Sequence, residues 1–156
     1  MSTLKPLTEN LNLLAPTGFR LTINRQKFTN TEFFVTQFSL PSINIGETQV
    51  NYKNAQGYVP GDTLSFDSLT MRMALDEKLV GYTELLTWMV DNETKLEVND
   101  MILSILGNQN ESSKQIQFSN AFPVSITGVE FDTTNTDIEY LQTDITFRYD
   151  RFTIIK

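Results

Sequence analysis

The chain of 156 residues contains no cysteine and no histidine. Thiolate nucleophiles, disulfides, Cys/His zinc sites and imidazole acid–base chemistry are therefore excluded, together with most familiar hydrolase mechanisms. No apolar run approaches the roughly 20 residues of a membrane-spanning helix, and the N-terminus lacks an apolar core of signal-peptide length. The sequence thus predicts a non-enzymatic protein, made and folded in a cytoplasm, with no cofactor and no membrane partner.

Positive charge is also scarce, because 12 Lys and Arg stand against 19 Asp and Glu, a formal net charge of −7. Affinity for a nucleic-acid backbone needs clustered cations, so we expect none. The length and the 40% apolar content suit one domain with a real core. Residues 1–16 have no sustained period and are predicted to form an N-terminal arm, followed by a single domain over residues 17–156.

Two early runs alternate apolar and polar residues with the period of a β-strand. Their apolar residues are expected on one buried face of each strand: Phe19, Leu21 and Ile23 in the first run, and Phe34, Phe38 and Leu40 in the second. Pro41 ends the second run because it cannot donate a ladder hydrogen bond.

Residues 45–61 contain β-prone pieces broken by glycine and proline, which predicts an irregular hairpin or an extended loop that projects from the domain. Within this segment Pro60 and Gly61 are expected to form a type II turn, with Gly61 in the left-handed conformation. The following strand run slips its register near Ser68, which predicts a β-bulge.

A helix is predicted over about residues 76–90, where apolar residues recur at helical spacing. The predicted buried stripe comprises Leu79, Tyr82, Leu85, Leu86 and Met89. Trp88 is expected near one edge of this stripe, and Asp76 and Glu77 are expected to cap the first amides and oppose the helix dipole.

The second half of the chain again favours strands. Residues 101–106 are apolar on both faces, which predicts a strand covered above and below. Residues 115–118 form a short partner strand, residues 119–123 a corner, and two alternating runs close the chain. Seven to nine short strands and one helix predict a mainly β fold, an antiparallel β-sandwich or open barrel with one flanking α-helix.

Acidic residues gather in "EFDTTNTDIE", where Glu130 and Asp132 could meet Asp137 and Glu139 across a hairpin. Solvated turn carboxylates are far commoner than catalytic dyads, so we assign no catalytic residue. With Asn135, the same oxygens could bind calcium, although the glycine and terminal Glu of the known loop are missing. A stand-alone binding module for calcium or carbohydrate therefore stays an alternative, and no metal ligand is assigned.

The final run, "YLQTDITFRYD", alternates most regularly. One face would carry Leu141, Thr143, Ile145, Phe147 and Tyr149, and the other Gln142, Asp144, Thr146, Arg148 and Asp150. This pattern fits a half-solvated strand of an ordinary sandwich. The alternative is a sheet whose polar face lines an aqueous channel made by several copies.

The order of segments resembles the tail-tube proteins of contractile-tailed bacteriophages, including the tube-like baseplate proteins that initiate the tube. The resemblance rests on "PTGFRLTI", "TQFSLPSINIGE", "PGDTLSFDSLTMRMALDE" before a Trp-bearing helix, and "NAFPVSITGVEF" before the final run. It implies a virion tail protein, assembled in the host cytoplasm into hexameric, stacked rings that conduct DNA during ejection. The implied partners are further copies, tail sheath and baseplate proteins, and DNA that passes without specific binding.

The resemblance also suggests residue roles. The polar set Gln142, Asp144, Thr146, Arg148 and Asp150 would face the lumen. Candidate residues of a ring-stacking loop are Val50, Tyr52, Tyr58 and Asp62. An acidic lining would offer DNA no phosphate trap. A tube initiator or another baseplate ring component is the related alternative.

Overall fold

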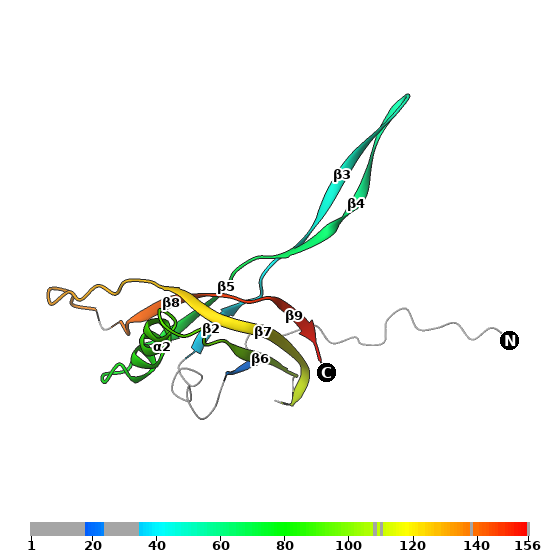
Figure 1. Cartoon of the computed structure of the whole chain (residues 1–156). Helices are drawn as coiled ribbons and strands as arrows, with labels where there is room; N and C mark the ends of the chain where they lie inside the picture. Colours follow the sequence, from blue (N-terminus) through cyan, green and yellow to red (C-terminus); the bar gives the residue numbers. More distant parts are fainter. Residues whose placement is uncertain (1–17, 24–34, 108, 110, 138, 156) are drawn as a thin grey trace.

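The computed structural model describes residues 18–23, 35–107, 109, 111–137 and 139–155. The predicted arm at residues 1–16, and Phe34, lie outside these ranges. The described residues form nine strands and one helix (Figure 1). Their bounds are β1 Phe19–Thr22, β2 Val35–Ser39, β3 Ile43–Tyr52, β4 Ala55–Phe66, β5 Leu69–Ala74, α2 Val80–Asp91, β6 Asn99–Leu106, β7 Ser112–Ile126, β8 Gln142–Arg148 and β9 Arg151–Ile154.

The main sheet is antiparallel and has the strand order β1-β6-β7-β8-β5-β2, with β9 also paired to β7. Strand β7 joins the two halves of the main sheet. Its first part pairs with β6 and β9, and its last part pairs with β8. The predicted short strand and corner are therefore parts of one strand of 15 residues. Asn120, at φ 54°, marks the corner, and its amide donates to the Asp100 carboxylate at 3.0 Å.

The core lies under this sheet and is covered by α2. Its largest fully buried side chains are Trp88, Phe118, Phe147, Leu69, Met71, Met73, Leu85, Met101 and Ile145. The Trp88 ring lies 5.9 Å from that of Phe147, and its indole nitrogen donates to the Glu97 carbonyl at 2.9 Å. The predicted covered strand β6 contributes Met101 to this core.

The helix begins at Val80, later than predicted. The Asp76 carboxylate accepts the Val80 amide at 2.9 Å, as predicted for Asp76. The N-cap residue itself is Leu79 and the first turn contains no acidic residue, so the predicted position of Glu77 in that turn is wrong. The predicted buried stripe is correct at Leu85 and wrong at Leu86. Trp88 is fully buried with Gly81 and Leu85, whereas Leu86 is 46% exposed. Residues 81, 85 and 88 follow steps of four and three, the spacing of one helix face.

Residues 43–66 form a hairpin, β3 and β4, with a register shift between Ile45 and Glu47, so the predicted irregular hairpin is confirmed and extends beyond residues 45–61. It turns at Lys53 and Asn54 and extends away from the body (Figure 1). Pro60 and Gly61 lie inside β4, and no described glycine has a positive φ, so the predicted type II turn is wrong. A Cβ at Gly61 would lie 2.7 Å from the Gly46 carbonyl oxygen, so the glycine permits close strand approach at a register shift.

Two smaller predictions also fail. The register slip near Ser68 is a strand boundary, because β4 ends at Phe66 and the chain enters the main sheet as β5. Leu40 is 54% exposed because β2 has already ended at Ser39. No helix within the described ranges is long and apolar enough to cross a membrane.

Candidate assembly surfaces

The first candidate surface, the polar face, is the outward side of β8 and its neighbour β5. The alternation predicted for β8 is confirmed. Thr143, Ile145 and Phe147 are buried, with exposed fractions of 2%, 0% and 0%, whereas the residues between them are exposed or half-buried. Leu141 was predicted to pack inward, but it precedes the strand and is 37% exposed. Whether the polar face lines a lumen stays a prediction.

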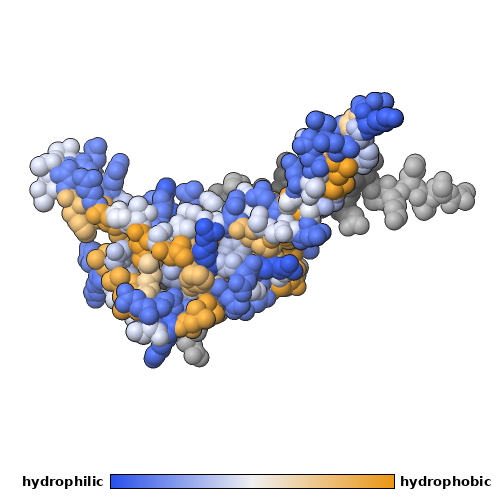
Figure 2. All heavy atoms as spheres, turned by 45° about the horizontal axis from the view of Figure 1, so that its top comes forward, coloured by the Kyte–Doolittle hydropathy of each residue, from blue (hydrophilic) through white to orange (hydrophobic). Residues whose placement is uncertain are grey.

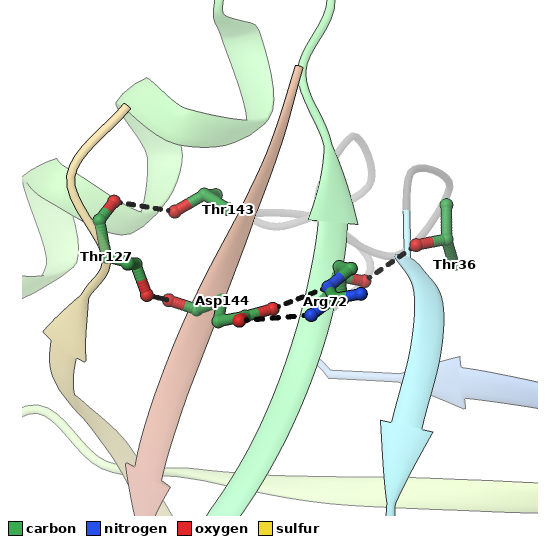
Figure 3. Close-up of polar contacts among 5 residues, drawn as sticks. All are labelled: Thr36, Arg72, Thr127, Thr143 and Asp144. Atoms are coloured by element: carbon green, nitrogen blue, oxygen red, sulfur yellow. Dashed lines mark hydrogen bonds and ion pairs between the residues drawn. The ribbon is translucent and has the colours of Figure 1, made fainter. Parts of the chain in front are cut away.

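An ion pair crosses the polar face. Arg72 lies directly opposite Asp144 in the β5–β8 register, and its Nε and Nη2 atoms donate to the two carboxylate oxygens at 2.8 and 3.3 Å (Figure 3). The hydrogen bond from Arg72 holds the pKa of Asp144 below its ordinary value, and the carboxylate raises the pKa of Arg72. Hydroxyls of Thr36 and Thr127 donate to the backbone carbonyls of Arg72 and Asp144, which extends this polar contact to β2 and the end of β7.

The formal charge of the polar face does not match the acidic lining that we expected. Along β5, β8 and the short connection after β8, the charged side chains are Arg72, Arg148, Asp144 and Asp150. Counted with Asp150, which lies just beyond the end of β8, two cations balance two anions. The Asp150 carboxylate also accepts the Asn120 side-chain amide at 2.7 Å. The excess of acidic over basic residues in the chain therefore lies outside the polar face.

The second candidate surface is the β3–β4 hairpin, which is fixed at its root. The Phe66 ring contacts those of Tyr149 and Phe152, with centroids 6.1 and 5.4 Å apart. The Tyr149 hydroxyl donates to the Asp67 carbonyl at 2.8 Å, and the Asp67 amide donates to the Ser42 carbonyl at 3.0 Å. Burial raises the pKa of Tyr149, which keeps this donor protonated. The hairpin therefore has a firm base.

Along its length the hairpin exposes large apolar side chains (Figure 2). They are Ile43 at 48%, Ile45 at 58%, Tyr52 at 62%, Tyr58 at 64%, Val59 at 40% and Leu64 at 44%. Ile45 lies directly opposite Leu64, so the two share one face near the root. A lone two-stranded hairpin is marginally stable in water. This surface is therefore suited to burial against a partner.

The four residues predicted for a stacking loop all lie on this hairpin. Val50 and Tyr52 share one face, whereas Tyr58 points to the opposite face because it pairs with Gln49. Asp62 lies in β4 and is exposed. A role for any of them in stacking stays a prediction.

The third candidate surface, the acidic loop, is the described part of residues 127–141 and extends from the end of the body opposite the hairpin (Figure 1). Its carboxylates do not converge, since the described residues contain no group of three Asp or Glu that could hold a metal ion. The Asp132 carboxylate accepts the Thr134 amide and hydroxyl at 2.9 and 2.6 Å, which lowers the pKa of Asp132. The Asn135 side chain accepts the Asp137 amide at 3.1 Å.

Sequence reasoning missed the exposed aromatic side chains of this loop. Phe131 is 75% exposed and Tyr140 is 84% exposed. The sequence did contain a signal for this exposure, because each aromatic residue lies beside a glutamate in a segment that forms no strand. The strand-like alternation of the segment made a half-buried strand the more obvious interpretation.

No family model and no curated protein matches the sequence. Solved structures do match. One is a chain in the tube-terminating cap of the anti-feeding prophage, 22% identical, with a TM-score of 0.71 over 95% of this chain and 94% of that chain. The chain has the fold of a tube protein. This likeness confirms the predicted mainly β fold class and, at the level of fold, the resemblance to the tail-tube family.

Two further solved structures are similar to this chain. A chain in the six-fold symmetrised baseplate of the anti-feeding prophage is 12% identical, with a TM-score of 0.68 over 88% of this chain and 90% of that chain. A chain in the sheath–tube complex of the PVC extracellular contractile injection system is 22% identical, with a TM-score of 0.62 and 93% of each chain covered.

Proposed function

We propose that the protein is a non-enzymatic structural subunit of a tail tube or of a related contractile particle. Copies assemble into rings, six to a ring, and the rings stack into a conduit through which a macromolecule, DNA in a phage tail, is ejected. Sheath and baseplate proteins are the expected neighbours, and the assembled tail is the expected location. The names of the structures that share the tube-protein fold support this assignment, and the six-fold symmetry of one supports the ring number.

The observation that carries the proposal is the polar face, which lies on a sheet with free edges. Strand β2 ends the strand order, and residues 122–126 of β7 pair only with β8 among the described strands. Main-chain pairing between the β2 edge of one copy and this β7 edge of the next would continue the sheet around a ring. Closing such a sheet places one face of every strand toward the axis.

The chemistry of the polar face suits a conduit. Arg72 is engaged by Asp144, so its guanidinium is not available as an isolated phosphate trap. The balanced charge gives a passing polyanion no clustered cations to bind. Thr70 and Thr146 on this face add neutral surface. We assign the lumen lining to Gln142, Asp144, Thr146, Arg148 and Asp150.

Sedimentation velocity and negative-stain imaging of the purified protein test the proposal. Rings with a central hole are expected as concentration rises, and a strictly monomeric protein at all concentrations would contradict it. Counting copies in isolated particles then distinguishes the related alternatives. Many rings per particle identify a polymerising tube subunit, whereas a single ring identifies an initiator, a terminator or another baseplate component.

A further inference from the structure

The acidic loop has no role in the ring described above. Residues 127–141 contain four carboxylates, at Glu130, Asp132, Asp137 and Glu139, and no lysine or arginine. Phe131 and Tyr140 expose 75% and 84% of their surface on the same loop. Exposed aromatic side chains within a local field of one sign are typical of a surface that becomes covered by a cationic partner.

Hydrogen bonds tie the start of the acidic loop to β8 and form local turns farther out. The Thr127 hydroxyl and amide both donate to the Asp144 carbonyl at 2.9 Å, and the Thr143 hydroxyl donates to the Thr127 carbonyl at 2.8 Å. Farther out, Asp132 and Asn135 accept hydrogen bonds from residues two positions on. Such ordering lowers the entropic cost of binding.

The complementary group lies at the other end of the same molecule. Lys53 is the only lysine or arginine in residues 43–66, and it lies in the turn at the tip of the hairpin. Its neighbour Tyr52 is 62% exposed and lies over Gly57, where an added Cβ would meet the ring at 2.7 Å. The tip therefore presents one cation and one supported aromatic ring.

We propose that the acidic loop of one copy receives the hairpin tip of a second copy in the next ring. Lys53 lies among the carboxylates of the loop, and Tyr52 packs against Phe131 and Tyr140. Because the two elements lie at opposite ends of the body (Figure 1), the contact is heterologous and repeats from ring to ring without closing. This inference rests on the proposed function and assigns the partner surface of the stacking hairpin.

Changing both aromatic residues to serine, Phe131→Ser with Tyr140→Ser, tests the contact. Negative-stain imaging is expected to show rings like those of the unchanged protein but mostly unstacked, with at least a tenfold loss of stacked rings. Leu96→Ser, at a residue 89% exposed beyond the helix, is the matched control and is expected to stack normally. Normal stacking of the double variant would overturn the inference. Absence of rings in the unchanged protein would instead contradict the proposed function.

Cysteine cross-linking identifies the partner element, because the chain has no cysteine of its own. Lys53→Cys protein is mixed with Glu130→Cys protein under stacking conditions and treated with a short bis-maleimide. A cross-linked dimer of the two variants is expected, whereas Lys53→Cys mixed with Thr94→Cys is expected to give little. Equal yields from the two mixtures, or no dimer with Glu130→Cys, would overturn the pairing of tip and loop.

Discussion

The body and the β3–β4 hairpin are built from the same alternating β pattern, yet they bury very different amounts of surface. The body encloses Trp88, Phe118 and Phe147 completely. The hairpin has no buried residue in either strand. Since burial of apolar surface is the main stabilising term in folding, we expect the body to be stable by itself and propose that the hairpin gains its packing from a neighbour. The two regions should therefore respond oppositely to substitution.

The largest effect on folding is expected in the body, from Trp88→Ala. The change removes a fully buried ring and the hydrogen bond to the Glu97 carbonyl. We expect the free energy of unfolding to fall by about 3–5 kcal/mol, measured by urea denaturation of the monomer. Leu96→Ala is the control and should stay within about 0.5 kcal/mol. A similarly small loss for Trp88→Ala would mean that this core does not stabilise the body.

The hairpin should show the reverse behaviour. Ile45→Ser with Leu64→Ser removes exposed apolar surface near the root and is expected to change monomer unfolding by no more than about 0.5 kcal/mol. Assembly, followed by sedimentation velocity, should nevertheless weaken at least tenfold. Assembly at the usual concentration would contradict the role of the hairpin as an interface.

A smaller, local effect is expected from Gly61→Val. The new Cβ would lie 2.7 Å from the Gly46 carbonyl oxygen, so the two strands must separate there. Hydrogen exchange should accelerate in residues 43–66 and stay unchanged in β5. Gly128→Val is the matched control, because nothing lies within 4 Å of a Cβ at that position. Acceleration throughout β5 as well would show that the hairpin and body unfold together.

The smallest effect is expected from the ion pair on the polar face. The folded pKa of Asp144 lies below its unfolded value of about 3.9, so its contribution to stability is present above that pH. The contribution is lost as the pH falls through the folded pKa, and it is small because the pair is solvent-exposed. In an NMR titration, Arg72→Gln should return the pKa of Asp144 toward its ordinary value. An unchanged pKa would mean that Arg72 does not hold this carboxylate in solution.

The sequence predicted the fold class and the two faces of β8, because a period of two determines which side chains can be buried together. It also predicted the projecting hairpin, but it misplaced a turn within it because Pro60 and Gly61 usually mark a turn. Only the pairing of β3 with β4 reveals that residue 61 must be a glycine because the Gly46 backbone lies too close for a Cβ atom. The ion pair between Arg72 and Asp144 joins residues 72 positions apart, so no local pattern could indicate it.

A cryo-EM map of rings assembled from the unchanged protein would show whether the polar face of β8 lines a channel made by several copies. We predict that Asp144, Thr146 and Arg148 point into the axial channel while the hairpin lies against a neighbouring subunit. A map in which this face of β8 lies on the outside of the ring would contradict the account.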